Sequence, residues 1–134
     1  MEKRAVTDEM LIKKAIQAMK RSYSPYSQFA VGAALLSKSG KIYTGTNVEN
    51  SSFGLTICAE RSAIVSAVSG GDRTFDCLVV ATNTETPSSP CGACRQVLVE
   101  FGDFRVILVN PRGARVDTSV SELLPYSFLL NQSK

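Results

Sequence analysis

The segment TICAERSAIVSA, residues 56–67, places a cysteine and a glutamate two positions apart at the start of a run of small and branched apolar residues. With the glycine pair at 70–71 as a stop signal, this pattern predicts a helix over 58–68. Each of the two residues at its start has an ordinary structural explanation. Cys58 could be a small buried residue, and Glu60 could interact favourably with the positive end of the helix dipole. The segment therefore indicates chemistry only if a second motif supports it.

A second cysteine motif, SPCGACRQ, follows at residues 89–96. Pro90 is favoured at or just before a helix start, and Cys91 and Cys94, three positions apart, share one helical face. An isolated pair with this spacing also fits a thioredoxin-like redox site or half of a structural zinc ribbon. A ribbon needs a second such pair, which the sequence lacks, whereas Cys58 offers a third ligand. Three protein ligands with one open position are typical of a catalytic zinc.

The remaining cysteine and the missing histidine narrow the chemistry further. Cys77 lies within FDCLVVAT, residues 75–82, which predicts a buried strand with this cysteine in the core. The chain contains no histidine, which excludes histidine triads and histidine metal ligands. Acid–base catalysis near neutral pH must then come from a carboxylate, a thiol or bound water.

Length and composition predict one globular domain over residues 1–134, with 44% hydrophobic and 20% charged residues. The net charge of +3 is spread along the chain without a basic block, which argues against a nucleic-acid partner and for a small molecule. No run approaches the length of a membrane span. Residues 1–22 lack the apolar core of a secretory signal, so we expect a cytoplasmic protein.

The order of predicted elements indicates a mixed sheet, with a parallel half and helices on its faces. The first helix, over 7–21, carries an apolar stripe formed by Met10, Leu11, Ala15, Ile16 and Met19. The following elements are a hairpin of 29–37 and 40–48, the helix at 58–68, strands at 75–82 and 104–110, a helix at 91–101, an edge strand after the turn at 111–118, and a short helix at 119–125.

The combination of Cys-x-Glu with Pro-Cys-x-x-Cys is the all-cysteine form of the zinc deaminase signature, in which the glutamate is a general acid and base. Together with SPYSQFAVGAAL, TGTNVENSSFG and LLPYSF, it makes residues 23–128 resemble the small homotetrameric cytidine deaminases that act on free nucleosides. The resemblance implies a three-layer α/β/α fold with a five-stranded mixed sheet and one zinc per subunit. It further implies hydrolytic deamination of cytidine and deoxycytidine to uridine and deoxyuridine, with release of ammonia, in pyrimidine salvage.

The resemblance also implies a role for each matching residue. Zinc ligands would be Cys58, Cys91 and Cys94, with Glu60 as the proton shuttle and Arg61 compensating the charge of the thiolates. Substrate-binding residues would be Phe29, Asn47, Glu49 and Ala59, with Phe53 and Phe128 reaching the pocket from neighbouring subunits. Taken singly, these residues also fit strand-end turns, core aromatics or a surface arginine. Phe53 stands where relatives often carry tyrosine, and the tail from Leu129 differs from a more usual Gly-Pro.

Two alternative functions remain open on the sequence. One is deamination of another cytosine-like nucleoside or analogue. The other is a non-catalytic module in which zinc braces the fold. Helical geometry by itself does not bring Cys58 and Glu60 together, because residues two apart on a regular helix do not share a face. The pairing of Cys58 with Glu60 rests on the motif.

Overall fold

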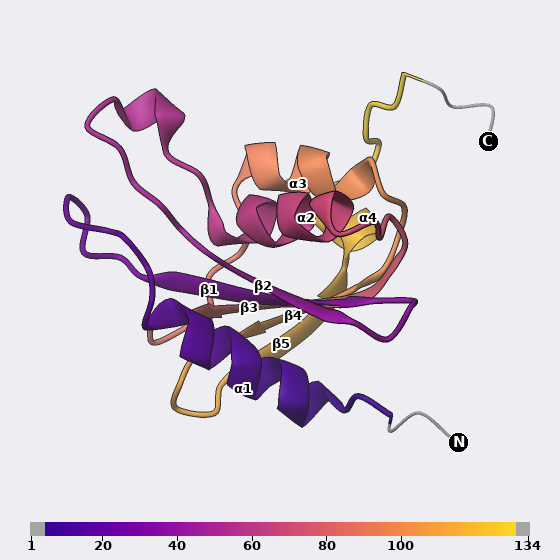
Figure 1. The fold of residues 1–134 in the computed structure, drawn as a ribbon, viewed down its shortest axis with the longest axis horizontal. Coiled ribbons are helices and arrows are strands. Elements are labelled where there is room, and N and C mark those ends of the chain that lie inside the picture. Colours follow the sequence, from indigo (N-terminus) through magenta and orange to yellow (C-terminus); the bar gives the residue numbers. More distant parts are fainter. Residues whose placement is uncertain (1–4, 131–134) are drawn as a thin grey trace.

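The computed structural model describes residues 5–130, which form a five-stranded sheet between two layers of helices (Figure 1). The helices are α1 (Asp8–Met19), α2 (Ala59–Ser69), α3 (Gly92–Val99) and α4 (Val120–Leu123), with a 3-10 turn η1 (Phe53–Leu55). The strands are β1 (Val31–Ser37), β2 (Ile42–Thr46), β3 (Phe75–Thr82), β4 (Arg105–Val109) and β5 (Arg115–Ser119). The two ends of the predicted domain, 1–4 and 131–134, lie outside the described residues, so its limits stay a prediction.

The three-layer arrangement is confirmed: α1 covers one face of the sheet, and α2, α3 and α4 cover the other (Figure 1). The strand order is β2-β1-β3-β4-β5. The mixed sheet is confirmed as well, but its parallel part is a single pair, β3 with β4, among the named strands. The parallel part is smaller than expected because β5 returns antiparallel to β4 through a turn at Gly113, whose φ is +97°.

The first helix begins and buries its side chains for identifiable reasons. Thr7 caps it, its hydroxyl accepting a hydrogen bond from the Met10 N–H at 3.2 Å. Its buried face consists of Leu11, Ala15 and Ala18, whereas Met10 is 37% exposed, so the predicted stripe was wrong at Met10 and missed Ala18. The small residues are needed because α1 lies directly on β1. A Cβ at Gly32 would lie 2.1 Å from the Ala15 carbonyl oxygen.

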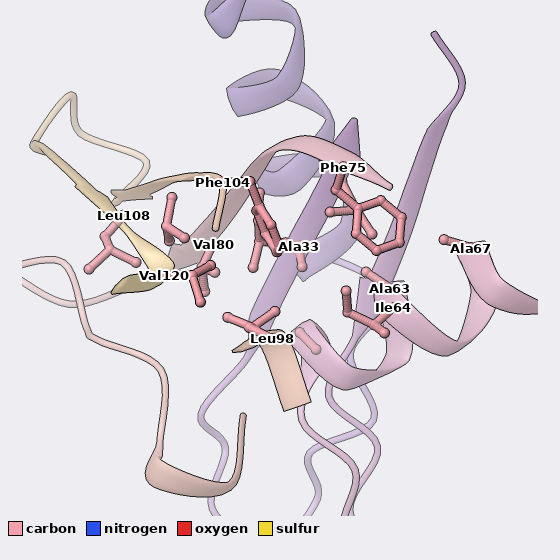
Figure 2. Packing of buried hydrophobic residues seen from close by; sticks show 14 of the residues in the cluster. Ala33, Ala63, Ile64, Ala67, Phe75, Val80, Leu98, Phe104, Leu108 and Val120 are labelled. Carbon is pink, nitrogen blue, oxygen red and sulfur yellow. The ribbon is translucent and has the colours of Figure 1, made fainter. Parts of the chain in front are cut away.

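Two apolar clusters hold the layers together. Figure 2 shows the larger one, where side chains of β1, β3 and β4 pack against α2 and α3. The smaller one lies under α1 and includes Cys77, which is 1% exposed. Burial raises the pKa of the Cys77 thiol to about 11. Its prediction as a core residue is confirmed.

The sheet brings distant segments to one edge. Val31, at the start of β1, pairs with Thr82, at the end of β3, and Gly32 pairs with Thr46 near the end of β2. The ends of β3 and β4 lie side by side because those strands are parallel. Segments that follow β2, β3 and β4 therefore meet the segment that precedes β1.

A second close approach sets the position of α2 over this edge. A Cβ at Gly45 would lie 2.4 Å from the Ala59 carbonyl oxygen and 2.5 Å from the Ala63 amide nitrogen. Only a glycine lets the first turns of α2 rest on β2 at this distance. The start of α2 is thereby held against the end of the hairpin.

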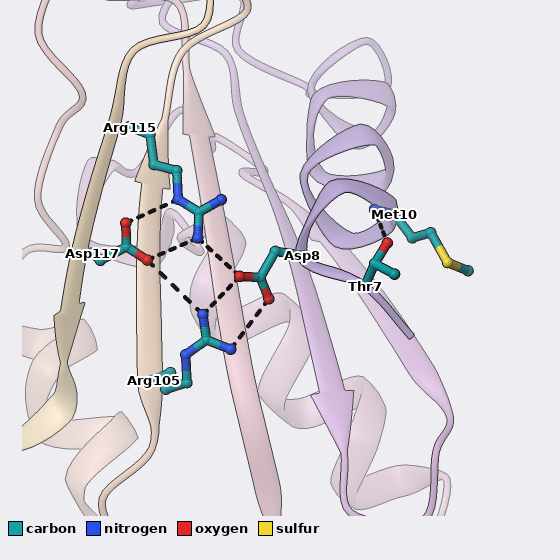
Figure 3. A network of polar contacts seen from close by, with 6 residues as sticks. All are labelled: Thr7, Asp8, Met10, Arg105, Arg115 and Asp117. Carbon is teal, nitrogen blue, oxygen red and sulfur yellow. Dashed lines mark hydrogen bonds and ion pairs between the residues drawn. The ribbon is translucent and has the colours of Figure 1, made fainter. Parts of the chain in front are cut away.

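An ion-pair network ties the start of α1 to β4 and β5 (Figure 3). The Asp8 carboxylate accepts hydrogen bonds from Arg105 at 2.8 Å and Arg115 at 2.9 Å, and Arg115 also contacts Asp117 at 2.9 Å. The hydrogen bond from Arg105, with those from Arg115 and the two positive charges, holds the pKa of Asp8 below its ordinary value of 3.8.

Among the described residues, no helix combines the length and apolar character needed to cross a membrane.

Replacing Asp8 by asparagine should lower the free energy of unfolding at pH 7 by about 1 kcal/mol, the scale of a partly exposed ion-pair network. Because the folded state lowers the pKa of Asp8, its contribution is present above its ordinary pKa and is lost as the pH falls through the folded-state pKa. The difference from the wild type should thus shrink below about pH 4. Denaturant unfolding of both proteins at several pH values measures it.

The matched control is Glu9→Gln, which removes a neighbouring carboxylate from the same first helical turn. It shares the helix-dipole effect but not the arginine contacts. Equal destabilisation by the two substitutions would show that the network contributes nothing of its own.

Candidate metal centre

Three cysteine sulfurs converge where α2 and α3 begin. Cys58 is the N-cap of α2, Cys91 is the N-cap of α3, and Cys94 lies in the first turn of α3. The sulfurs of Cys58 and Cys91 are 3.8 Å apart, those of Cys91 and Cys94 are 3.3 Å apart, and all three lie within 4.8 Å of one another. Tetrahedral zinc with bonds of about 2.3 Å to sulfur places two sulfurs about 3.8 Å apart. The donor set fits zinc.

The three thiols cannot all ionise so close together without a cation. The pKa of Cys58 is lowered to about 5, mainly by a hydrogen bond from the Cys94 thiol and further by Arg61. The pKa of Cys94 is correspondingly raised, because its thiol is hydrogen-bonded to Cys58 and is buried. A divalent cation among the sulfurs would remove this competition and stabilise all three as thiolates.

Cys58 and Glu60 face the same cavity because the chain bends between them. Cys58 has extended backbone angles, φ −76° and ψ 154°, whereas Glu60 already lies within α2. Because Cys58 precedes the regular helix, its side chain and that of Glu60 can point to the same side. Glu60 is 5% exposed, and this burial raises the pKa of its carboxyl to about 6.

The cavity has a volume of about 260 Å³ and extends from the sulfurs to the segment that precedes β1. Of the residues predicted from the sequence, the lining contains Cys58, Cys91, Glu60, Ala59, Phe29, Asn47 and Glu49. Cys94, which carries the third sulfur, is fully buried and does not line the cavity. Among the described residues that line the cavity, Glu49 and Glu60 are the only carboxylates, and none is a lysine or an arginine.

Two predicted pocket residues do not reach the cavity within one chain. Phe53 is 74% exposed and touches Tyr26 edge-to-face, with the ring centroids 5.9 Å apart. Phe128 is 65% exposed, although its carbonyl oxygen accepts a hydrogen bond from the Gln96 side chain at 2.9 Å. Their predicted place, in a neighbouring subunit's pocket, stays a prediction.

Arg61 lies beside the Cys58 sulfur. Its guanidinium donates to the Thr56 carbonyl oxygen at 3.3 Å and to the Cys58 sulfur at 3.5 Å. The hydrogen bond to Cys58 raises the pKa of Arg61, so its positive charge is retained next to the sulfur.

Several polar residues that line the cavity were not predicted from the sequence, namely Ser27, Thr56, Thr82, Ser88 and Ser89. They lie in loops and at strand ends, where serine and threonine are common for reasons of local geometry. Their position beside the cavity follows from strand pairing, which no local pattern in the sequence specifies.

Arg95 was also missed, although it immediately follows Cys94. Its Nε donates to the Pro90 carbonyl oxygen at 2.8 Å and its Nη2 to the Ser89 hydroxyl at 2.6 Å, so it holds the segment that leads into Cys91. Its Nη1 donates to the Leu123 carbonyl oxygen at 2.7 Å. One side chain thus ties the metal-binding loop to the end of α4.

Comparison with known proteins agrees with this geometry. Residues 5–110 match a family described as the cytidine and deoxycytidylate deaminase zinc-binding region. The chain is 51% identical over 122 residues to a cytidine deaminase of Sporosarcina psychrophila, and the match covers 90% of each chain. It is also 51% identical over 122 residues to a cytidine deaminase of Halalkalibacterium halodurans, and that match covers 90% of this chain and 92% of the other. The crystal structure of cytidine deaminase from Burkholderia pseudomallei superposes with a TM-score of 0.89 at 46% identity, covering 92% of this chain and 100% of the other.

Arg95→Ala should accelerate the loss of zinc to a chelator by about 10-fold, the scale seen when groups that orient metal ligands are removed. The reason is that the segment before Cys91 loses two hydrogen bonds from one side chain, one at the Pro90 carbonyl oxygen and one at the Ser89 hydroxyl. Zinc release measured with a colorimetric chelator tests this expectation. Arg105→Ala, on the opposite face beside Asp8, is the control and should release zinc at the wild-type rate. Identical release from all three proteins would remove Arg95 from this role.

Proposed function

This chain belongs to the cytidine deaminase family of zinc-dependent hydrolytic enzymes, and from that premise we propose which of its residues perform the reaction. The reaction converts cytidine or deoxycytidine and water into uridine or deoxyuridine and ammonia. A C4–O bond forms and the C4–N bond to the amino group breaks. The observation that supports the assignment of residues is the convergence of three cysteine sulfurs and one buried glutamate on a single cavity.

Cys58, Cys91 and Cys94 would hold one zinc ion per subunit. When bound, zinc lowers the pKa of a coordinated water from about 15.7 towards about 7, which supplies a nucleophile at neutral pH. Three thiolates give the centre an excess of negative charge. Arg61, in contact with the Cys58 sulfur, would offset part of that charge.

Glu60 would move the protons of the reaction. It would take one proton from the attacking water and deliver it to N3 of the pyrimidine, which makes C4 electrophilic. It would then take the second proton from the new C4 hydroxyl and deliver it to the amino group, which leaves as ammonia while the C4 carbonyl forms. A pKa raised to about 6 by burial suits a group that must both accept and release a proton near neutral pH. Its place beside the sulfurs in the cavity lining supports this role.

The rest of the cavity lining would bind the nucleoside. Phe29 would pack on the base, the backbone of Ala59 would contact it beside the metal ligands, and Asn47 and Glu49 would form hydrogen bonds with ribose hydroxyls, with the Glu49 carboxylate as an acceptor. All four line the cavity. The absence of a basic side chain from the described lining favours an uncharged nucleoside over a nucleotide, because nothing there would neutralise a phosphate.

We further propose that the protein works as a homotetramer whose subunits share their pockets. Phe53 and Phe128 are large apolar side chains that remain exposed in the single chain, which is the feature expected of residues that complete a neighbour's site. Recovery of a uracil nucleoside from cytidine would serve pyrimidine salvage. A cytoplasmic location would keep the three cysteines reduced and available to zinc.

Glu60→Gln should retain zinc and lose about 10²–10⁴-fold in turnover, because the amide cannot carry the protons. Ammonia released from cytidine measures turnover, and metal analysis of the same sample measures zinc. The control is Glu122→Gln, an exposed carboxylate on α4 far along the chain from the motif. A zinc-loaded glutamine variant with wild-type turnover would leave the cysteines in place but remove Glu60 from the reaction.

Sharing of pockets predicts complementation between two defective variants. Co-expressed Glu60→Gln and Phe128→Ala subunits should regain up to roughly a quarter of wild-type activity, since one chain supplies the glutamate and its neighbour the aromatic ring. Each variant alone is the control and should be weakly active. If Phe128 served only its own chain, the mixed assembly would be no more active than the average of the two variants, and light scattering would show whether an assembly forms at all.

A further inference from the structure

The segment from Ser24 to Ala30 contributes Ser27 and Phe29 to the cavity lining and contains a strained residue. Gln28 has a φ of +58°, in the left-handed region that side-chain-bearing residues rarely adopt. Its N–H donates to the Ser24 carbonyl oxygen at 3.0 Å, which closes a tight turn. Backbone strain of this kind persists where surrounding contacts over-determine the conformation. The contacts that do so here come largely from the two polar residues predicted to bind ribose.

Glu49 is held by two consecutive residues of this segment. One carboxylate oxygen, Oε1, accepts hydrogen bonds from the Tyr26 N–H at 2.9 Å and the Ser27 N–H at 3.1 Å. The other oxygen, Oε2, accepts one from the Ser27 hydroxyl. The Ser27 hydroxyl bond is the largest cause that lowers the pKa of Glu49, so this carboxylate is ionised and acts as an acceptor.

Phe29 is held from both sides of its peptide backbone. Its N–H donates to the Ser27 hydroxyl at 3.0 Å, and its carbonyl oxygen accepts from the Asn47 side-chain amide at 2.7 Å. Asn47 in turn accepts from the Val31 N–H at 2.9 Å. Ser27 therefore links the residue proposed to pack on the base with the residue proposed to bind the ribose.

The count of acceptor sites on Glu49 indicates where a ribose hydroxyl would bind. A carboxylate oxygen accepts about two hydrogen bonds. Oε1 already accepts two from the backbone, whereas Oε2 accepts one, from Ser27. A ribose hydroxyl would bind Oε2, the oxygen whose direction the Ser27 hydroxyl sets.

We infer that Ser27 is a positioning residue for the nucleoside: its hydroxyl fixes the distance and angle between the base-packing Phe29 and the ribose-binding Oε2 of Glu49. The inference rests on the proposed function, because it takes both contacts from there. Ser27 touches no reacting atom, so its removal should weaken binding of the sugar more than it slows the chemical step.

Ser27→Ala tests this on three substrates: cytidine, deoxycytidine and 3′-deoxycytidine. For cytidine, KM should rise about 10-fold with kcat changed by less than about 2-fold, since a hydrogen bond to a charged acceptor is lost. For whichever deoxy analogue lacks the hydroxyl that Glu49 binds, the penalty should disappear. Glu49→Gln should show the same dependence on the substrate, with its effect lost on the same analogue.

Two further variants make the result specific. Ser27→Thr keeps the hydroxyl and should restore most of the affinity for cytidine. Ser51→Ala removes a nearby hydroxyl that contacts Tyr26 and not Glu49, and it should behave as the wild type. Zinc content and the thermal unfolding midpoint confirm that each variant is folded.

The outcomes separate the inference from the function on which it rests. The inference is overturned if Ser27→Ala raises KM equally for all three substrates, or for none of them, and the effect of Glu49→Gln still differs between the substrates. If Glu49→Gln leaves KM unchanged for all three substrates, Glu49 does not bind ribose, and the inference is overturned as well. Wild-type activity on cytidine is untouched by either result, so deamination itself is judged separately.

Discussion

The site depends on two helices beginning side by side over one edge of the sheet. Cys58 and Cys91 are the N-cap residues of α2 and α3, and their sulfurs are 3.8 Å apart although 33 positions separate them in the chain. Neither side chain caps its own helix with a hydrogen bond, so both sulfurs remain available to a metal. Three thiols at this distance would compete for protons, and a divalent cation relieves that competition. Metal binding and the mutual position of the two helices therefore stabilise each other.

The sheet supplies the rigid frame for this arrangement. Pairing of Val31 with Thr82 places the segment before β1 opposite the loop after β3, and the close contact at Gly45 presses the start of α2 onto the hairpin. The cysteines that could hold a metal thus come from the starts of two helices, and the nucleoside-binding candidates Phe29, Asn47 and Glu49 come from the segments that flank the hairpin. Loops provide the remaining polar groups, and side chains such as Arg95 and Ser27 hold those loops in place. This division suits a catalytic site, in which rigid elements fix the reacting groups and loops adapt to the substrate.

Most elements could be predicted because their signals are local. Alternation, apolar runs and glycine stops marked the strands and helices to within about two residues, the usual uncertainty at an element's end. The prediction failed where contact with a neighbouring element of the fold decided which residues are buried or which way a strand runs. Met10 is 37% exposed and Ala18 is fully buried because the side of α1 that faces the sheet is set by its packing on β1, where Ala15 and Met19 lie against Gly32. The helical pattern alone does not reveal that contact. The parallel part of the sheet was overestimated for a similar reason, since strand direction depends on how the connections run.

The sequence by itself determined which atoms are available for chemistry: three thiols in a distinctive spacing, a glutamate two residues from one of them, and no histidine to replace either. Only the tertiary structure decided how those atoms meet. It placed Cys58 on extended backbone outside the helix, which lets the sulfur and the Glu60 carboxyl share one cavity, and it brought Ser27 against Glu49 across 22 positions of sequence. The physical reason is that residue type and spacing act over one or two turns of chain, whereas distances between segments are set by strand register and close packing.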